Sequence, residues 1–367
     1  MAKGFTLEIN PAVFIAKYQE NGTWYEWYEE KPHLPKSEED KLSEEKKNEY
    51  NTKRNSFPEF PLVNYTTQYG FGCFEGLKAF PQKAGGLKLF RPDENGKRMA
   101  RSMEGLMMPV FPAEKFLKAV LETVAKNEEL GFTPKYNQDW EKEDFVLGHS
   151  IYIRPFTYAE PGIGLNLSHF PWVIVITTNV GAYFMPGNAK AITTKMVRAT
   201  PYGTGWIKCN ANYVTSTIAK KKAMADGYME AIFLDAEHRK YIEEGSSCNI
   251  FFLLKNGVLV TPALRDTVLP GITRKSIIQI AKDKGVTVEE RQISVEEVMS
   301  EAEEVFVAGT ATGVCYIESL THNGKTVIFC NGKMGETTNY FLKTLKGIQY
   351  GKLEDKYGWM MSANLDN

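Results

Sequence analysis

The sequence predicts a two-domain α/β protein, and two observations support this fold class. The chain has 367 residues, of which 43% are hydrophobic, and a chain of this length exceeds what one hydrophobic core usually organises. Short runs of β-branched and aromatic residues also alternate with stretches whose apolar residues recur at helical spacing. Because this alternation is present in both halves of the chain, we expect strands and helices in each domain.

The first domain is expected to span residues 1–183. It contains a mixed-charge segment near 35–54 with too few apolar residues to add much core, so we expect a solvated insertion or a short exposed helix there. Helical periodicity follows at 97–108 and at 113–128, where a proline precedes the second helix and suits its first turn. A β-branched run at 172–178 predicts a buried strand.

The second domain is expected to span residues 199–367. Apolar periodicity is lost at 184–198, which predicts an interdomain linker. Beyond the linker, apolar runs at 249–254 and 257–260 predict buried strands. Helical spacing recurs at 212–226, 273–284 and 294–301.

Charge and hydropathy argue against two classes of partner. The formal net charge of −1 gives no field that would gather nucleic acid or an anionic membrane, which favours a small molecule or another subunit as the partner. No apolar run approaches the roughly 20 residues that a membrane-spanning helix needs, and we find no targeting signal near the N-terminus. We therefore expect an untargeted protein that does not enter a membrane.

The cysteines and histidines indicate neither a disulfide framework nor a metal site. The five cysteines are scattered without a C-x-x-C pair, and this usage is typical of the reducing cytoplasm. The five histidines lie far apart, without the spacing of metal ligands. The sequence also lacks a P-loop, a dinucleotide-binding fingerprint and the G-x-S-x-G of serine hydrolases. Metal, nucleotide and serine-hydrolase chemistry are therefore not expected.

A lysine follows a glycine-rich turn at 203–208. Lys208 stands shortly before the helix expected from Asn212, so it can be partly buried, and burial lowers the pKa of a lysine and lets it form a Schiff base. By spacing alone, a solvated surface lysine is the commoner interpretation.

Two adjacent acidic residues, Glu243 and Glu244, precede the apolar strand expected at 249–254. A turn in this place can aim a carboxylate into a site, and a pyridine cofactor needs such an anion to keep its ring nitrogen protonated. An exposed acidic turn is the alternative.

Two turns could bind a phosphate. The segment 269–274 opens a helix that runs to about Lys284, with Gly285 placed to end it, and the free N–H groups and positive dipole end of such a helix attract anions. The small residues at 309–313 form a second turn whose amides could contact an anion. Either could equally be an ordinary turn or helix cap.

Taken in order along the chain, these segments resemble the fold-type IV pyridoxal-phosphate enzymes, and specifically the branched-chain amino-acid aminotransferases. The resemblance runs from about residue 60 to residue 316. It rests on the motifs at 69–80, 89–92 with Arg98, 152–155, 180–184, 203–208 with Tyr213, 244–251, 269–274 and 309–311. It implies a two-domain fold similar to that of D-amino-acid aminotransferase, pyridoxal 5′-phosphate as the cofactor, and a homodimer.

Matched position by position, the resemblance implies a role for each group around the cofactor. Lys208 would anchor the cofactor and move a proton between it and the substrate. Glu244 would pair with the pyridinium nitrogen, and Tyr213 would hydrogen-bond the phenolic oxygen. The phosphate would be held by Arg98, by the amides of Ile272 and Thr273, and by Thr310.

The resemblance also implies a pocket for the substrate. Its residues would be Tyr69, Phe74, Tyr152, Tyr183, Thr310 and Ala311, with the amides of the last two facing the α-carboxylate. Arg154 would meet the second carboxylate of glutamate, while the aromatic walls would receive the side chain of leucine, isoleucine or valine. A structural ion pair is the alternative role for Arg154. The implied reaction is the reversible transfer of the amino group of these amino acids to 2-oxoglutarate.

The chain departs from the family pattern in three places, and two other functions compete with the implied one. The charged segment near 35–54 has no counterpart in the family pattern, no C-x-x-C of the mammalian, redox-sensitive kind stands at 312–315, and Asn210-Ala211 replaces a usual Gly-Gly pair. Another fold-type IV reaction, such as that of D-amino-acid or R-amine transaminases or aminodeoxychorismate lyase, is less consistent with the segment 74–79 and with the long first domain. A cofactor-free binding protein is disfavoured because Lys208 and its expected companions are all retained.

Overall fold

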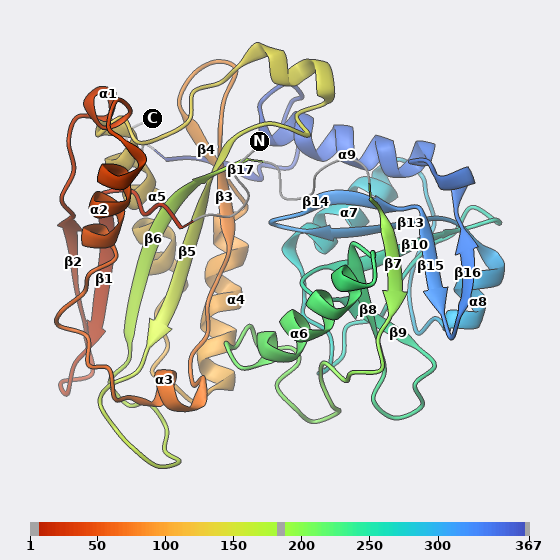
Figure 1. Cartoon of the computed structure of the whole chain (residues 1–367), viewed down its shortest axis with the longest axis horizontal. Coiled ribbons are helices and arrows are strands. Elements are labelled where there is room, and N and C mark those ends of the chain that lie inside the picture. The colour runs from red at the N-terminus through yellow and green to blue at the C-terminus, as the bar shows by residue number, and fades with distance from the viewer. Residues whose placement is uncertain (1–6, 182–187, 364–367) are drawn as a thin grey trace. The chain divides into compact units, whose positions relative to one another are not determined.

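The computed structural model describes residues 7–181 and 188–363, and the chain forms two compact units (Figure 1). The first unit comprises Met1–Tyr183, Cys209–Ala211 and Gly347–Asn367, and the second comprises Phe184–Lys208 and Asn212–Lys346. Each unit contains both sheet and helix. The predicted mixed α/β fold class is therefore confirmed.

The first unit is built on one antiparallel sheet of seven strands, in the order β17-β4-β3-β5-β6-β1-β2. The strands are β1 (Ala12–Tyr18), β2 (Trp24–Glu30), β3 (Leu77–Pro81), β4 (Leu87–Phe90), β5 (Ser150–Tyr158), β6 (Trp172–Val180) and β17 (Met360–Ser362). The helices are α1 (Lys36–Glu39), α2 (Glu44–Arg54), α3 (Tyr65–Tyr69), α4 (Pro92–Gly105), α5 (Ala113–Glu129) and the 3₁₀ helix η1 (Gln138–Glu143).

Helices α4 and α5 cover one face of this sheet (Figure 1). Both were predicted from their periodicity, and α4 begins earlier than expected because Pro92 occupies its first turn. On α5, Phe116, Val120 and Val124 lie on one side of the helix and are fully buried. These side chains form one core with the strand residues that point toward the helices.

The opposite face of the sheet carries the predicted substrate residues of β5. Side chains alternate between the two faces of a strand, and Ile151 and Ile153 belong to the core beneath α4 and α5. Tyr152 and Arg154 therefore lie on the other face, where Phe156 packs into a second, aromatic cluster.

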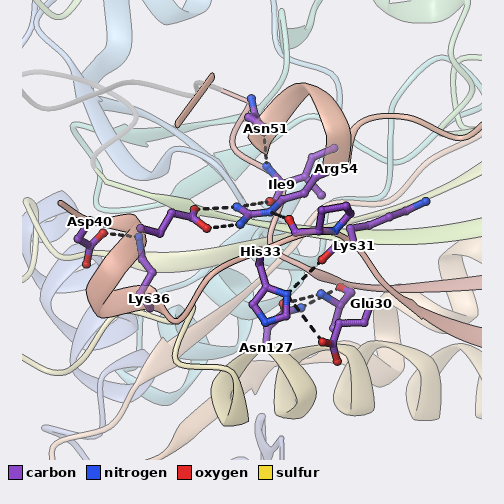
Figure 2. A network of polar contacts seen from close by, with 12 residues as sticks. Ile9, Glu30, Lys31, His33, Lys36, Asp40, Asn51, Arg54 and Asn127 are labelled. Atoms are coloured by element: carbon purple, nitrogen blue, oxygen red, sulfur yellow. Dashed lines mark hydrogen bonds and ion pairs between the residues drawn. The ribbon is translucent and has the colours of Figure 1, made fainter. Parts of the chain in front are cut away.

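The charged segment at 35–54 is more than a solvated insertion. It folds into α1 and α2, and although most of its side chains are exposed, Glu39 and Arg54 are buried and form an ion pair. Arg54 also donates to the carbonyl of Pro32 (3.1 Å), and Asn51 accepts from the amide of Ile9 (3.0 Å), next to β1 (Figure 2). The segment thus docks on the sheet through its polar side chains, which its charge pattern did not reveal.

The second unit contains two sheets of five strands, in the orders β16-β15-β7-β8-β9 and β12-β11-β10-β13-β14. The strands are β7 (Lys190–Thr193), β8 (Glu230–Leu234), β9 (Ile242–Gly245), β10 (Asn249–Leu254), β11 (Leu259–Thr261), β12 (Val288–Glu290), β13 (Ala302–Gly309), β14 (Gly313–Ile317), β15 (Ser319–His322) and β16 (Lys325–Ile328). The helices are α6 (Asn212–Ala225), α7 (Ile272–Asp283), α8 (Val295–Glu301), α9 (Glu336–Gln349) and the 3₁₀ helix η2 (Cys330–Gly332).

The two sheets of the second unit share a core, and helices cover their outer faces. Ile232 of β8 and Phe252 of β10 belong to the same buried cluster. Helix α6 packs on β8 through its alanines, and Phe341 of α9 contacts Phe306 of β13, with 5.6 Å between the ring centres. The unit is therefore layered as helix, sheet, sheet and helix.

The division into units differs from the predicted domain boundaries in two places. The expected linker contains β7, which pairs with β8 and β15 inside a sheet, and its residues 184–187 lie outside the described part of the chain. The segment from Gly347 returns to the first unit because β17 pairs with β4 there. Within 7–181 and 188–363, no helix is long and apolar enough to cross a membrane.

Candidate active site

The loop that carries Lys208 is held by the first residue of α6. Asn212 Nδ2 donates to the carbonyl oxygens of Thr204 (2.7 Å) and Ile207 (3.0 Å), and its Oδ1 accepts from Thr204 Oγ1 (2.9 Å). Gly205 packs so tightly that a Cβ there would lie 2.7 Å from two backbone atoms. Glycine at this position is therefore a steric requirement, and the loop has little freedom.

Lys208 is half-buried and contacts the phenol of Tyr213. Its Nζ donates to Tyr213 Oη at 2.7 Å. Tyr213 is the second residue of α6, so the helix that clamps the loop also carries the partner of the lysine. The structure thus brings together the amine and the phenol that the sequence predicts at the cofactor.

Glu244 is a buried carboxylate at the end of β9. Its Oε1 lies 2.6 Å from Arg198 Nε, and its Oε2 accepts from Asn249 Nδ2 at 3.3 Å. The Nε of Arg198 has no hydrogen-bond partner among the described residues, so the first contact is an ion pair without a directed hydrogen bond. Burial raises the pKa of Glu244 to about 7, and the positive charge of Arg198 opposes this rise. A further cation beside Glu244 would therefore favour its ionised form.

The neighbouring acid, Glu243, has a different environment. Its Oε1 accepts from Thr267 Oγ1 at 2.5 Å, and its buried Oε2 has no hydrogen-bond partner among the described residues. Burial raises the pKa of Glu243 as well. Because adjacent residues of a strand point to opposite faces, only one of the two acids can face a given ligand.

The turn before α7 is tied to Glu244 through one amide side chain. Asn249 Nδ2 also donates to the carbonyl of Leu269 at 3.1 Å. Gly271 approaches Asn249 Oδ1 so closely that a Cβ on Gly271 would overlap it. Gly271 is the N-cap of α7 and offers no side-chain cap, so the first amides of the helix, those of Ile272 and Thr273, keep the character of an anion site.

The second predicted phosphate turn connects β13 to β14. Residues 310–312 form this turn, and the pairing of Gly309 with Gly313 closes it. Lys346 of α9 lies beneath it, with its Cε 3.4 Å from where a Cβ on Gly313 would be. Burial lowers the pKa of Lys346 to about 8. Thr310 and Ala311 are half-buried.

Three of the predicted substrate residues lie together in the first unit. Arg154 donates to the hydroxyl of Tyr152 at 2.8 Å, and its guanidinium carbon lies 4.6 Å from the ring centre of Phe74. Arg154 Nε is buried without a hydrogen-bond partner, and no carboxylate pairs with Arg154 within 7–181 and 188–363. The structural ion pair considered from the sequence is absent from this part of the chain.

Arg98, predicted as a phosphate ligand, lies in the first unit and contacts a carboxylate. Its Nε and one terminal nitrogen donate to the two oxygens of Glu75, at 2.7 and 2.8 Å. Glu75 is fully buried, and Asn95 donates to it at 2.7 Å. The hydroxyl of Tyr69, a predicted pocket residue, accepts from the amide of Gly164 at 3.0 Å. Tyr183 lies outside the described residues.

Three polar residues of the site were missed from the sequence. Arg198 and Asn249 each contact Glu244, and Glu75 contacts Arg98. Arg198 and Asn249 stood inside segments interpreted as linker and strand, where local pattern gives no sign of a polar contact. Glu75 stood inside a recognised motif, and a buried arginine's need for a counter-charge could have indicated it.

Comparisons with known proteins show the family and the fold of the chain. The sequence matches the family described as amino-transferase class IV over residues 72–320. A "probable branched-chain-amino-acid aminotransferase" of Staphylococcus epidermidis is 40% identical over 305 residues, which cover 80% of this chain and 81% of the relative. The crystal structure of a branched-chain aminotransferase from Thermoproteus uzoniensis with norvaline is similar with a TM-score of 0.71 and 30% identity, covering 84% of this chain and 95% of that chain. Another crystal structure, of a T.th. branched-chain amino acid aminotransferase with pyridoxamine 5′-phosphate, has a TM-score of 0.71 and 28% identity, covering 84% and 94%.

Proposed function

This chain belongs to the class IV aminotransferases, and we propose that it exchanges amino groups between branched-chain amino acids and 2-oxo acids, with pyridoxal 5′-phosphate as the cofactor. The amino group of leucine, isoleucine or valine passes to 2-oxoglutarate, giving a branched 2-oxo acid and glutamate. The observation that carries the proposal is the hydrogen-bonded pair of Lys208 and Tyr213 in the same unit as the buried Glu244.

The chemistry of these side chains fits the cofactor. When bound, pyridoxal phosphate supplies an aldehyde for the amino group and a ring that withdraws electrons from the substrate α-carbon. Lys208 would hold the aldehyde carbon, and Tyr213 would hydrogen-bond the phenolic oxygen. Glu244, whose pKa burial raises to about 7, would gain a cationic partner at the ring nitrogen. This match of a buried acid to a ring cation is the main electrostatic support.

The phosphate would be held by groups that are already suited to an anion. The amides of Ile272 and Thr273 begin a helix without a side-chain cap. Thr310 would add a hydroxyl from the turn after β13. Arg98 would contribute positive charge, which it now shares with Glu75.

Lys208 would also move the proton that the reaction transfers. Its amine would accept the proton of the substrate α-carbon and would deliver that proton on the side of the cofactor. Tyr213 Oη accepts a hydrogen bond from this amine at 2.7 Å, so the phenol keeps the amine oriented throughout.

The substrate side chain would be received by the cluster of the first unit. Phe74 and Tyr152 offer apolar rings to a branched side chain, and Tyr69 and Tyr183 would add to these walls. Arg154 has no carboxylate partner in the described chain, and its Nε is buried, so it is suited to the second carboxylate of glutamate. The amides of Thr310 and Ala311 would face the α-carboxylate. The cluster of the first unit would then receive the side chains of both substrates.

Further proposals concern assembly and compartment. We propose that the two compact units are the two catalytic domains, that the protein is a homodimer, and that it works in the cytoplasm. The family resemblance supports the dimer, and the five free cysteines support a reducing compartment. Light scattering of the purified protein tests the dimer, and a monomeric mass would contradict it.

A half-reaction panel tests the substrate class. The cofactor-loaded protein is mixed with leucine, isoleucine, valine, D-alanine or an R-amine, and the conversion of the cofactor to its amine form is followed by absorbance. Conversion by the branched L-amino acids is expected. Conversion by D-alanine or the R-amine alone would indicate one of the other fold-type IV reactions.

Substitution tests the anchor. Lys208→Ala is expected to abolish transamination. It is also expected to abolish the covalent attachment of the cofactor that borohydride reduction makes permanent. Lys325→Ala, at an exposed position on β16, is the matched control and is expected to keep both. Substantial turnover by Lys208→Ala would mean that another lysine is the anchor.

A further inference from the structure

A buried carboxylate that no proposed step uses lies beneath the turn after Glu244. Glu230 is the first residue of β8 and is fully buried. Its Oε2 lies 3.2 Å from Lys220 Nζ. Its Oε1 accepts from the backbone amides of Ala231 at 3.0 Å and Ser246 at 3.1 Å. The carboxylate thus contacts a helix, its own strand and a turn.

The two longer-range contacts of Glu230 reach the elements that carry the cofactor groups. Lys220 lies on α6, whose first turn carries Tyr213. Ser246 stands two residues after Glu244 and directly follows β9. The ion pair therefore links the helix of the phenol to the turn of the ring-nitrogen carboxylate, within one unit.

The turn over Glu230 is tightly packed. A Cβ on Gly245 would lie 3.5 Å from Glu230 Cγ and 2.7 Å from Cys248 Sγ. Cys248 Sγ itself lies 3.8 Å from Glu230 Oε2. Burial, and then the negative charge of Glu230, keep the pKa of the Cys248 thiol well above its usual value. The thiol therefore stays neutral and the ammonium of Lys220 is the charge that balances Glu230.

A buried ion pair adds little to the stability of a fold, because the free-energy cost of removing both charges from water offsets their attraction. A pair of apolar side chains would fill the same space at a similar or lower free energy. The ion pair differs from an apolar pair because it fixes the orientation of the Glu230 carboxylate. Both of its oxygens accept from donors that lie on separate elements.

We propose that Glu230 is a positioning residue that, with Lys220, fixes the orientation of Glu244 toward the ring nitrogen of the bound cofactor; this inference rests on the proposed function. Glu230 does not touch the cofactor or the substrate. It acts through the amide of Ser246 and through α6, so that the carboxylate and the phenol keep a constant spacing. The expected effect is on the electronic state of the ring, beyond any effect on folding.

The test is a pH titration of the absorbance of the bound cofactor in the Glu230→Gln variant. Glutamine keeps the size of the side chain and an oxygen for the two amides but loses the charge that holds Lys220. If Glu244 holds the ring nitrogen less firmly, that nitrogen loses its proton more readily, and the rest of the conjugated system becomes more basic. The midpoint of the absorbance titration is therefore expected to rise by about one pH unit, which is a tenfold change in proton affinity. We expect kcat to fall roughly tenfold, the lower end of the loss known for groups that orient the ligands of a metal site, with KM changed much less.

Two further variants separate positioning from folding. Glu304→Gln alters another buried carboxylate of the second unit, one that accepts from the Thr338 amide at 2.7 Å at the start of α9, and it is expected to leave the midpoint unchanged. Glu230→Gln with Lys220→Met also removes the partly buried ammonium and keeps the measurement possible if the single variant fails to fold. The midpoint of this double variant is expected to rise as well.

The outcomes are distinct. A folded Glu230 variant with an unchanged midpoint overturns the inference, and so does an equal shift in Glu304→Gln, because the effect would then be general destabilisation. A parent protein without a cofactor absorbance band would contradict the proposed function itself. A parent protein with the band and turnover, beside an unaffected variant, would overturn the positioning role alone.

Discussion

At the scale of single residues, the site depends on a carboxylate that is buried away from water beside an arginine. Glu244 Oε1 lies 2.6 Å from Arg198 Nε, and the pKa of Glu244 is nonetheless raised to about 7. Desolvation therefore outweighs the attraction of one arginine. A second cation, supplied by a ligand, would reverse this balance, which is the property expected of a carboxylate that binds a ring nitrogen.

Glu244 is expected to make the stability of the cofactor-free protein fall with rising pH. Its pKa is 4.5 in a solvated reference state and about 7 in the fold, so between these values the folded state binds a proton that the unfolded state has released. The free energy of unfolding therefore decreases across this window, by up to about 3 kcal/mol, and the loss is complete above the folded pKa. Urea unfolding near pH 5 and near pH 8 is the measurement.

The matched variant for this pH dependence is Glu244→Gln, which cannot ionise. Its decrease in unfolding free energy between the two pH values is expected to be smaller than that of the parent. Glu243 and Glu128, whose pKa values burial also raises, remain in both proteins and supply the residual slope. An identical slope in parent and variant would show that Glu244 does not cause the pH dependence.

The sequence located the residues of this site unequally. Lys208 and Glu244 were predicted from motifs that resemble those of a known family, because the local turns alone left a surface lysine and an exposed acidic turn as alternatives. Arg198 and Asn249 contact Glu244 only because the tertiary fold brings separate segments together, and no local pattern encodes such contacts. The burial of Glu39 and Arg54 was missed for the same reason, since a run of charges is usually solvated.

At the scale of elements, several helices and the strand β10 followed the prediction closely, whereas α4 begins at Pro92 and not at the expected residue 97. The expected helices at 113–128, 212–226 and 273–284 correspond to α5, α6 and α7 with shifts of one residue at either end. Proline and glycine punctuation gives a helix local start and stop signals. Strand β7 was missed, because its four residues include an exposed lysine and its partners β8 and β15 are distant in sequence.

The end of α7 gives a prediction at this scale. Gly285 follows the helix with φ +79°, and nothing lies within 4 Å of where its Cβ would be. Gly285→Ala therefore tests backbone strain without a clash, and we expect a loss of about 1–2 kcal/mol. Chemical unfolding measures it, with Lys282→Ala on the exposed side of α7 as the control, expected to change stability by less than about 0.5 kcal/mol. Equal effects of the two substitutions would contradict this explanation.

The docking of α1 and α2 on the first unit depends on the buried pair of Glu39 and Arg54. Arg54→Met leaves a buried carboxylate without its partner and is expected to cost about 3–5 kcal/mol. The double variant Arg54→Met with Glu39→Leu removes both charges and is expected to cost less than Arg54→Met alone. Urea unfolding of the parent, the two single variants and the double variant measures the coupling. Additive losses would mean that the pair does not act as a unit.

At the scale of the whole molecule, the second unit is inserted into the first. Residues 1–183 belong to the first unit, and most of the residues from 184 to 346 form the second. The chain then returns to the first unit at Gly347. Tyr350 marks this return: it is fully buried and stacks on Phe145 with 4.5 Å between ring centres. Gly148 makes room for it, since a Cβ there would lie 2.5 Å from Tyr350 Oη.

Tyr350→Ala is therefore expected to destabilise the first unit, although the residue follows α9 of the second. Removing a buried aromatic ring costs about 3–5 kcal/mol. Tryptophan fluorescence during urea unfolding is a suitable probe, because five of the six tryptophans belong to the first unit: Trp24, Trp27, Trp140, Trp172 and Trp359. Tyr340→Ala, on α9 and 38% exposed, is the control and is expected to have a much smaller effect. A transition unchanged by Tyr350→Ala would show that this ring is not part of the core.

The return of the chain also has a consequence for the order in which the protein can fold during synthesis. The ribosome makes six strands of the seven-stranded sheet early, but the edge strand β17 and the ring of Tyr350 are made after the whole second unit. Domains generally fold as they emerge, yet the first unit here lacks an edge strand and part of its core until residues 350–362 have left the ribosome. The unit that begins first is therefore completed last, and during that interval its open edge at β4 is exposed to pairing with other chains.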